Sequence, residues 1–353
     1  MRGGPPPPAD ALKDAAYRSS DDVRVVPTAP VEATEVRDPH VVMDRGLGLR
    51  ALVRQAALEL GLLPRLADEV ALQTPAEPRR PGRLLVASDL DRTLVYSAQA
   101  LGLNGPDARA PRLVVAEVYQ GAPISFHTRD AGLILTALAE VSVLVPVTTR
   151  TRAQYERVRL PTEPRYAIVA NGGHILEAGV SDREWSVSLA ARLESGCAPL
   201  AEVVEHLQTI SDPAWLLKSR VAEDLFAYLV VDRERLPATL LAELTGWCAP
   251  RGWSVSLQGR KVYCVPDLLT KSSAVAEVAR RCGAVLTAAA GDSLLDADML
   301  AAADVAVRPA HGELNDVGWM SPNLRVTTGA WVLGGQEICA RLLALALAVS
   351  PTS

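Results

Sequence analysis

Short, uninterrupted apolar runs recur through the second part of this chain and alternate with segments of helical spacing. The runs are 84–87, 142–147, 166–170, 284–290 and 304–307, and helical segments are expected near 130–140, 151–158, 271–282 and 294–303. A continuous apolar run is typical of a strand that is buried on both faces of a parallel sheet. The alternation therefore predicts an α/β fold, a doubly wound (Rossmann-like) parallel sheet with helices on both faces.

The stretch between the third and fourth apolar runs does not follow this alternation. It carries strands and helices of its own, which predicts an inserted α+β cap domain. The start of the chain is rich in Pro, Asp and Ala, which is typical of a flexible tail. The expected organisation is a tail over 1–44, a helical extension and linker over 45–82, a core domain made of 83–177 and 267–353, and a cap over 178–266.

Composition limits the compartment and the partners. The net charge of -5 gives no electrostatic case for binding nucleic acid or an anionic membrane. The five cysteines are odd in number and form no Cys-x-x-Cys pair, so neither a disulfide framework nor a zinc site is expected. The apolar stretch 331–349 contains Glu337 and Arg341, which favours a packed terminal helix over a membrane span. We expect a cytoplasmic protein with no nucleic-acid or membrane partner.

Two carboxylates, Asp89 and Asp91, follow directly after the first apolar run. In an open parallel sheet, ligands gather beyond the carboxyl ends of the strands. One carboxylate there can attack phosphorus to form an aspartyl-phosphate, and the other can protonate the leaving oxygen and later activate water. The pair therefore indicates phosphoryl transfer, although an acidic turn at a strand end would give the same short pattern.

Two further segments supply groups that bind phosphate. Thr148, Thr149 and Arg150 end the second run, where a hydroxyl and backbone amides can bind an anion, or simply cap a helix. Lys271 opens a predicted helix, a position that the helix dipole disfavours. An ammonium group placed there suits an anionic site, and the alternative is a solvated surface lysine.

A second pair of carboxylates, Asp292 and Asp296, follows the fourth run. The spacing predicts that the two side chains share one face of a helical turn. Together with Asp89 they could hold a hard cation such as Mg²⁺, which prefers oxygen ligands. Such a cation would offset the repulsion between an anionic phosphate and the aspartates.

The four segments, in this order, resemble the haloacid dehalogenase (HAD) superfamily of aspartyl-phosphate phosphatases. The resemblance implies that Asp89 is the nucleophile, Asp91 the acid/base, and Thr148 and Lys271 phosphate ligands. It also implies a Mg²⁺ site whose ligands come from the four aspartates: Asp89, the main chain of Asp91, and Asp292, with Asp296 in support.

Asn171 and Gly172, after the third run, resemble the step before the cap in the Cof-like, sucrose-phosphate phosphatase and phosphomannomutase branch of that superfamily. The resemblance implies that these two residues contribute to substrate binding and that the substrate is a sugar phosphate or similar phosphomonoester. Arg92 departs from the branch, which usually has glycine there, and the predicted hairpin at 111–128 is longer than usual. In the cap, Arg260 lies in a polar turn, where it could recognise the substrate or form part of a solvated β-turn.

The leading hypothesis is a Mg²⁺-dependent phosphohydrolase that acts on a small phosphorylated metabolite. Two alternatives remain: a catalytically silent HAD-fold binding or regulatory module, and a phosphomutase, which shares the first aspartates. The presence of every catalytic residue type favours the enzyme over the silent module.

Overall fold

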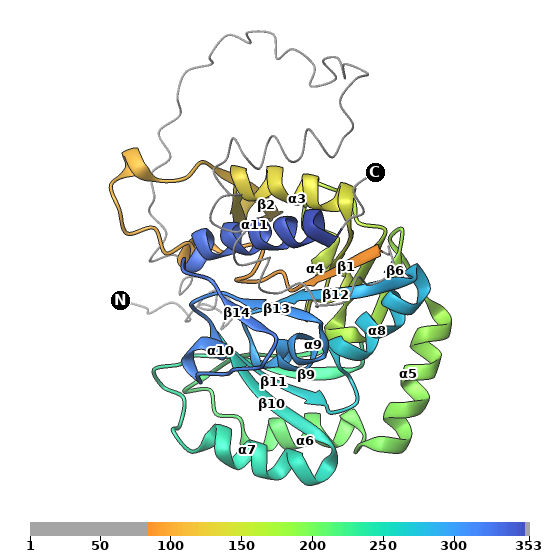
Figure 1. Ribbon diagram of the computed structural model, residues 1–353. Coiled ribbons are helices and arrows are strands. Elements are labelled where there is room, and N and C mark those ends of the chain that lie inside the picture. Colours follow the sequence, from red (N-terminus) through yellow and green to blue (C-terminus); the bar gives the residue numbers. More distant parts are fainter. Residues whose placement is uncertain (1–82, 350–353) are drawn as a thin grey trace, which may run out of the picture. The chain divides into compact units, whose positions relative to one another are not determined.

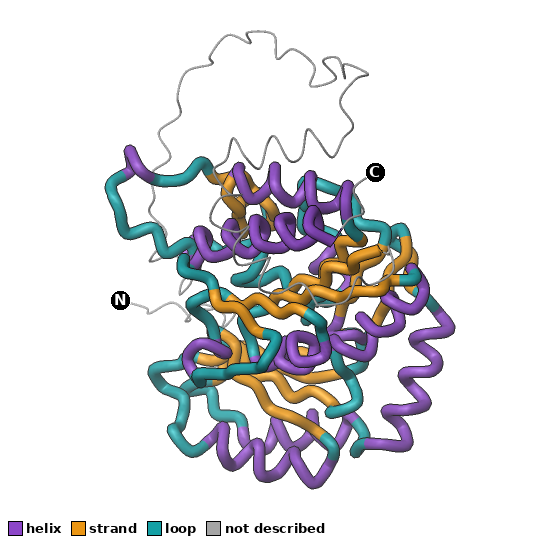
Figure 2. Tube along the Cα trace, viewed as in Figure 1, coloured by secondary structure: helices purple, strands orange, loops and turns teal. Residues whose placement is uncertain are grey.

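The structure is a computed structural model that describes residues 83–349. Its centre is a five-stranded parallel sheet in the order β14-β13-β12-β1-β4 (Figures 1 and 2). The strands are β1 (Arg83–Ser88), β4 (Val143–Pro146), β12 (Ala284–Ala290), β13 (Val305–Arg308) and β14 (Leu324–Val326). The predicted doubly wound α/β core is therefore present.

Helices cover both faces of this sheet because side chains alternate along each buried strand. Leu84 and Val86 of β1 pack with α3 (Arg129–Val141) and α11 (Trp331–Val349). Leu85 and Ala87 face the other side and pack with α8 (Lys271–Cys282) and α9 (Ala297–Ala302). In Figure 1, α3 and α11 run together along one side of the sheet, with α8 and α9 on the other.

The third predicted core strand pairs differently from expectation. β5 (Tyr166–Val169) forms an antiparallel sheet with β6 (His174–Glu177) and β7 (Val180–Ser181). It meets the parallel sheet through one bridge, between Val147 and Ile168. β14 is a short strand at the sheet edge without an apolar run of its own, so the sequence pattern does not predict it.

The expected hairpin is present as β2 (Leu113–Tyr119) and β3 (Ala122–Thr128), which pair antiparallel. Positive φ values at Gln120 and Gly121 form the turn between them. Phe126 of β3 exchanges backbone hydrogen bonds with Tyr96, which follows the loop after β1. The hairpin is thereby attached to the segment that carries the first two aspartates.

The predicted insert forms a second sheet, in the order β10-β11-β9-β8, flanked by helices with their own apolar core (Figure 1). Phe226 and Trp253 are among its largest buried side chains. The elements are α5 (Arg183–Gly196), α6 (Leu200–Ile210), β8 (Leu216–Ala222), β9 (Phe226–Val231), α7 (Leu240–Cys248), β10 (Trp253–Gln258) and β11 (Lys261–Pro266). We call this unit the cap.

The terminal helix α11 is long and apolar enough to cross a membrane by length and composition alone, but 61% of its most apolar window is buried inside the protein. It packs against α3, β3 and β1, as expected of a core helix. The predicted tail, extension and linker over 1–82 lie outside the described residues.

Candidate active site

The backbone places Asp89 at the carboxyl end of β1. Its amide donates to the carbonyl of Ala290 at 2.8 Å, which extends the β1–β12 ladder by one residue. The carbonyl of Leu90 then accepts from the amides of residues 93, 94 and 95, so the chain turns tightly just after the nucleophile candidate. The Asp89 side chain is 8% exposed and points into the space beyond the strand ends.

Lys271 is the first residue of α8, after the N-cap Thr270, and its side chain is buried. Its Nζ lies 2.7 Å from Oδ1 of Asp89 and 2.5 Å from Oδ1 of Asp296. Burial alone would lower the pKa of Lys271, but the two carboxylates hold that pKa above its usual range. The lysine predicted to meet an anionic site is therefore a buried cation between two acids.

Asp296 orients the loop after β12. Its Oδ2 accepts from the amides of Asp292 and Ser293 at 3.1 and 2.9 Å, and from the Ser293 hydroxyl at 2.7 Å. The expectation that Asp292 and Asp296 stand side by side on a helical turn is only partly correct, because Asp292 precedes the 3-10 turn Leu294–Asp296 and Asp296 folds back on it. Both carboxylate oxygens of Asp296 therefore already accept hydrogen bonds, from Lys271 and from the loop after β12.

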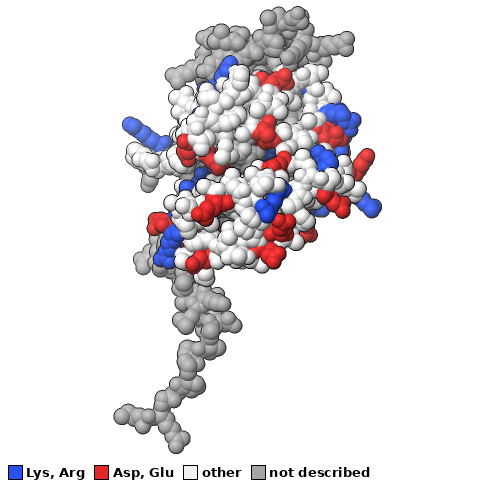
Figure 3. Space-filling model, turned by 90° about the horizontal axis from the view of Figure 1, so that it is seen from below, with Lys and Arg blue, Asp and Glu red and all other residues white. Residues whose placement is uncertain are grey.

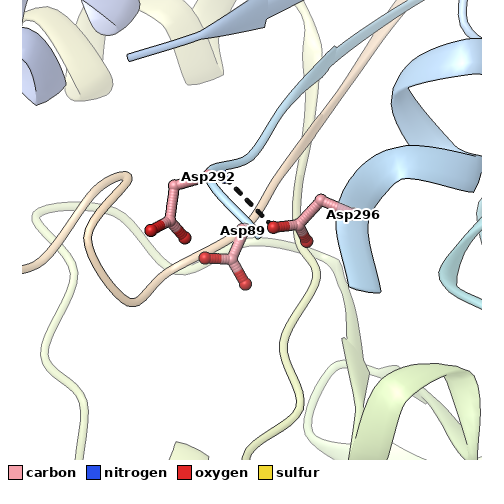
Figure 4. A group of neighbouring side chains, drawn as sticks. All are labelled: Asp89, Asp292 and Asp296. Carbon is pink, nitrogen blue, oxygen red and sulfur yellow. Dashed lines mark hydrogen bonds between the residues drawn. The ribbon is translucent and has the colours of Figure 1, made fainter. Parts of the chain in front are cut away.

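Three carboxylates lie close together here, and two of them bind the ammonium group of Lys271. Oxygen atoms of Asp89, Asp292 and Asp296 all lie within 4.8 Å of one another, and all three residues are buried (Figure 4). Burial raises the pKa of Asp89 to about 7, against the attraction of Lys271 and with the help of Asp296. Burial, Asp89 and Asp296 also hold the pKa of Asp292 well above its usual range.

This donor set fits a hard divalent cation. Within residues 83–349, neither Oδ2 of Asp89 nor the carboxylate of Asp292 accepts a hydrogen bond, so these oxygens are available as ligands. Gly312 closes over Asp292, since a Cβ there would lie 2.5 Å from Oδ2 of Asp292. Oxygen ligands with excess negative charge are the type that Mg²⁺ prefers.

Asp91 is held by a neighbouring arginine and not by the lysine. Arg150 donates through Nε and Nη2 to both oxygens of Asp91 at 2.8 Å, and through Nη1 to Glu117 at 2.7 Å. Desolvation would raise the pKa of Asp91, although its side chain is still 53% exposed, but the hydrogen bonds and charge of Arg150 bring that pKa below its ordinary value. Arg150, predicted to bind substrate, therefore has its guanidinium group engaged by two carboxylates.

Glu117 is a site residue that the sequence did not reveal. It lies on β2, is 1% exposed, and also accepts from Nε of Arg157 at 3.0 Å. An acid in the middle of a hairpin strand usually faces solvent, and only the fold shows that this one reaches the loop after β4. Through Arg150, the hairpin fixes the position of Asp91.

Thr148 and Thr149 lie just beyond β4. Thr148 is fully buried and its Oγ1 accepts from the amide of Arg150 at 3.1 Å. Thr149 lines a pocket together with Asp89, Asp91 and Asp292. The two threonines thus separate into one that shapes the loop and one that faces the open space.

Asn171 and Gly172 hold the start of α8 in place. Asn171 Nδ2 donates to the carbonyl of Leu269 at 2.8 Å. Gly172 has φ 99°, and a Cβ there would lie 2.3 Å from the carbonyl oxygen of Thr270. Neither residue lines the pocket, so in this structure they position Lys271 and do not reach the open space beside Asp89.

The pocket has a volume of about 540 Å³ and is lined by both the core and the cap. The cap contributes Tyr263, Lys261 and Arg260, and the predicted specificity residue Arg260 is thus placed on the pocket wall. Glu313 of the core accepts from the hydroxyl of Ser256 in β10 at 3.2 Å, which joins the two walls.

Comparisons with known proteins give no match to a family model and none to a curated protein sequence. Among solved structures, the chain is similar to the sucrose-phosphatase from Synechocystis sp. PCC6803 in complex with sucrose and phosphate, with 15% identity, 74% of this chain and 98% of that chain covered, and a TM-score of 0.49. It is also similar to a phosphatase of the HAD superfamily from Bacteroides thetaiotaomicron (13% identity, 77% and 99% covered, TM-score 0.45). A third similar structure is the C-terminal domain of trehalose-6-phosphate phosphatase from C. albicans. It is 12% identical, the match covers 80% of this chain and 96% of that chain, and the TM-score is 0.44.

The imbalance of charge around Lys271 leads to a prediction for Asp292→Asn. At pH 7 the ionised form of Asp292 costs stability, because its folded pKa lies above its unfolded pKa. The metal-free variant should therefore melt at a higher temperature than the wild type. Added Mg²⁺ should raise the melting temperature of the wild type, because a ligand that binds only the folded state stabilises it, but not that of the variant.

Thermal melts in EDTA and in Mg²⁺ measure both effects. Glu140→Gln, which removes an exposed carboxylate from α3, is the control and should respond to Mg²⁺ as the wild type does. A variant that keeps the full Mg²⁺ response would exclude Asp292 as a ligand.

Proposed function

We propose that this protein is a Mg²⁺-dependent phosphohydrolase that cleaves a small phosphomonoester, such as a sugar phosphate, through an aspartyl-phosphate intermediate. The observation that carries the proposal is the buried Asp89 at the end of β1, bound to Lys271 and facing Asp292. A nucleophilic carboxylate, a fixed cation and free oxygen ligands meet there at the mouth of a pocket.

In the first half of the reaction, a carboxylate oxygen of Asp89 attacks phosphorus and the bond to the leaving oxygen breaks. The protonated carboxyl of Asp91 gives its proton to that oxygen, and the alcohol leaves. In the second half, Asp91 takes a proton from water as the water attacks phosphorus, which frees Asp89 and inorganic phosphate. A bound Mg²⁺ would offset the charge between phosphate and the aspartates, held by Asp89, Asp292 and the main chain of Asp91.

Arg150 affects the two halves differently. By lowering the pKa of Asp91 it favours the ionised form, which is the base needed to activate water. The protonated form of Asp91, which is needed in the first half of the reaction, is disfavoured while both of its carboxylate oxygens accept hydrogen bonds from Arg150. Arg150 is therefore proposed as a positioning residue that tunes Asp91, in addition to any contact with the phosphoryl group.

Phosphate release from a panel of phosphorylated metabolites, with Mg²⁺ and with EDTA, tests the proposal. We expect release from at least one sugar phosphate or related monoester, and none in EDTA. Retention of the phosphoryl group on a rearranged sugar would indicate a phosphomutase. Binding without turnover across the panel would indicate a silent binding module.

A further inference from the structure

The cap end of the pocket carries positively charged side chains that the phosphoryl chemistry does not use. Arg233, Arg260 and Lys261 line it from the cap, and Arg92 from the core. Lys261 lies 5.4 Å from the ring centre of Tyr228, and its charge helps to lower the pKa of Asp91 after the larger effect of Arg150. We call the other three, Arg92, Arg233 and Arg260, the arginine cluster.

Arg92 reaches from the core loop toward the cap turn. Its backbone has φ 61°, a left-handed conformation that a bulky residue rarely adopts. The carbonyl of Arg92 accepts from Nε2 of the buried His311 at 2.9 Å, which fixes this conformation. A Cβ on Gly259 would lie 3.7 Å from Nη2 of Arg92, so the guanidinium group lies beside the turn that precedes Arg260.

The arginine cluster forms no ion pair with the described residues, although the charge of Arg92 acts on Asp292. Across residues 83–349, the side chains of these three arginines make no hydrogen bond or ion pair, in contrast to Arg150 with its two carboxylates. On the face seen in Figure 3, acidic and basic side chains are interspersed. Three arginines at the cap end of the pocket that form no ion pair therefore leave positive charge there available to a ligand.

The carboxylates of the pocket are used elsewhere. Asp89 and Asp292 belong to the cation site, and Asp91 is paired with Arg150. Glu313 accepts from Ser256 and from the amide of Leu294 at 2.9 Å. Asp316, which is exposed on α10 (Glu313–Asp316), forms no ion pair with the arginine cluster in the described structure.

We infer that the substrate carries a second anionic group, distant from the phosphoryl group that is cleaved, and that the arginine cluster binds it. This inference rests on the proposed function and specifies its substrate class. A guanidinium group binds a carboxylate or phosphoryl group through two parallel hydrogen bonds. Hydroxyls alone would leave the charge of all three arginines without a counter-ion. Arg92 is half-buried and Arg233 and Arg260 are exposed, so a bound substrate can reach all three. The shared chemistry is an oxyanion, either a carboxylate or a second phosphoryl group.

Phosphate-release assays of the full chain with Mg²⁺ can tell whether the second anion is a carboxylate or a phosphoryl group. Two pairs of compounds are compared. 3-Phosphoglycerate and glycerol 3-phosphate differ by a carboxylate in place of a hydroxymethyl group. Fructose 1,6-bisphosphate and fructose 6-phosphate differ by a second phosphoryl group. The wild type should have a KM about tenfold or more lower for the anionic member of at least one pair, the effect of a charge-assisted hydrogen bond.

Arg260→Gln should remove most of that preference, by raising the KM of the preferred anionic compound while leaving its less anionic partner within about twofold. Arg183→Gln is the control: Arg183 is an exposed arginine in the first turn of α5, also in the cap, and does not line the pocket. It should keep the wild-type preference.

Preference within one pair identifies the anion as a carboxylate or a phosphoryl group. Two outcomes would overturn the inference and leave the proposed function standing. One is equal KM values for the two compounds of each pair. The other is an equal rise in KM for both compounds of a pair in the Arg260→Gln variant. If no compound releases phosphate, the proposed function fails, and calorimetric affinities for the same pairs still decide whether the arginine cluster binds a second anion.

Discussion

Asp89→Asn is expected to lower kcat by on the order of 10⁴-fold or more, as loss of a nucleophile does in other enzymes with covalent intermediates. The amide has the same shape and can still accept a hydrogen bond from Lys271, so the fold should persist. Phosphate release in Mg²⁺ measures the loss, and circular dichroism with thermal melting checks the fold.

Asp130→Asn, at an exposed position in the first turn of α3, is the matched control and should keep wild-type turnover. A wild-type protein quenched in acid during turnover should carry a phosphoryl group that the Asp89 variant lacks. Near wild-type phosphate release by Asp89→Asn would refute the proposed chemistry.

Lys271→Met should have the largest effect on stability. It leaves Asp89 and Asp296 buried without their cation, and breaking one side of a buried ion pair costs about 3–5 kcal/mol. Urea unfolding in EDTA should show this loss in the free energy of unfolding. Mg²⁺ should recover part of it, because the metal restores positive charge among the carboxylates.

The exposed Lys218 of β8 supplies the control, and Lys218→Met should change stability by less than about 0.5 kcal/mol. The double variant Lys271→Met/Asp296→Asn should be more stable than Lys271→Met alone, since it removes one of the orphaned charges. If both Lys271→Met variants unfold like the wild type, the buried lysine does not balance the carboxylates.

The core of the fold was predictable because its strands are continuous apolar runs. β1 and β12 follow the runs at 84–87 and 284–290 almost residue for residue. The edge strand β14 has three residues and no such run. β5 has the expected apolar residues, but its antiparallel pairing with β6 depends on the turn at Asn171 and Gly172, whose positive φ values the sequence pattern does not specify.

The candidate site was predictable where the sheet brings strand ends together. Asp89, Lys271, Asp292 and Asp296 do meet, as neighbouring strands and the start of α8 require. Glu117 could not be predicted, because its contact with Arg150 joins a hairpin strand to the loop after β4. Interactions between side chains so distant in sequence depend on tertiary packing, which local spacing does not encode.

The hydrogen bond from Asn171 to Leu269 joins the segment that enters the cap to the segment that leaves it. Both connections between the core and the cap therefore meet at one place, and we expect any movement of the cap relative to the core to pivot there. Lys261, whose charge acts on Asp91, and Tyr263, whose side chain bonds to Thr149, would move away together during such a movement. The same movement of the cap would then allow the alcohol to leave and water to enter. In that case the rate of cap opening, and not the cleavage of the phosphate ester, would limit kcat.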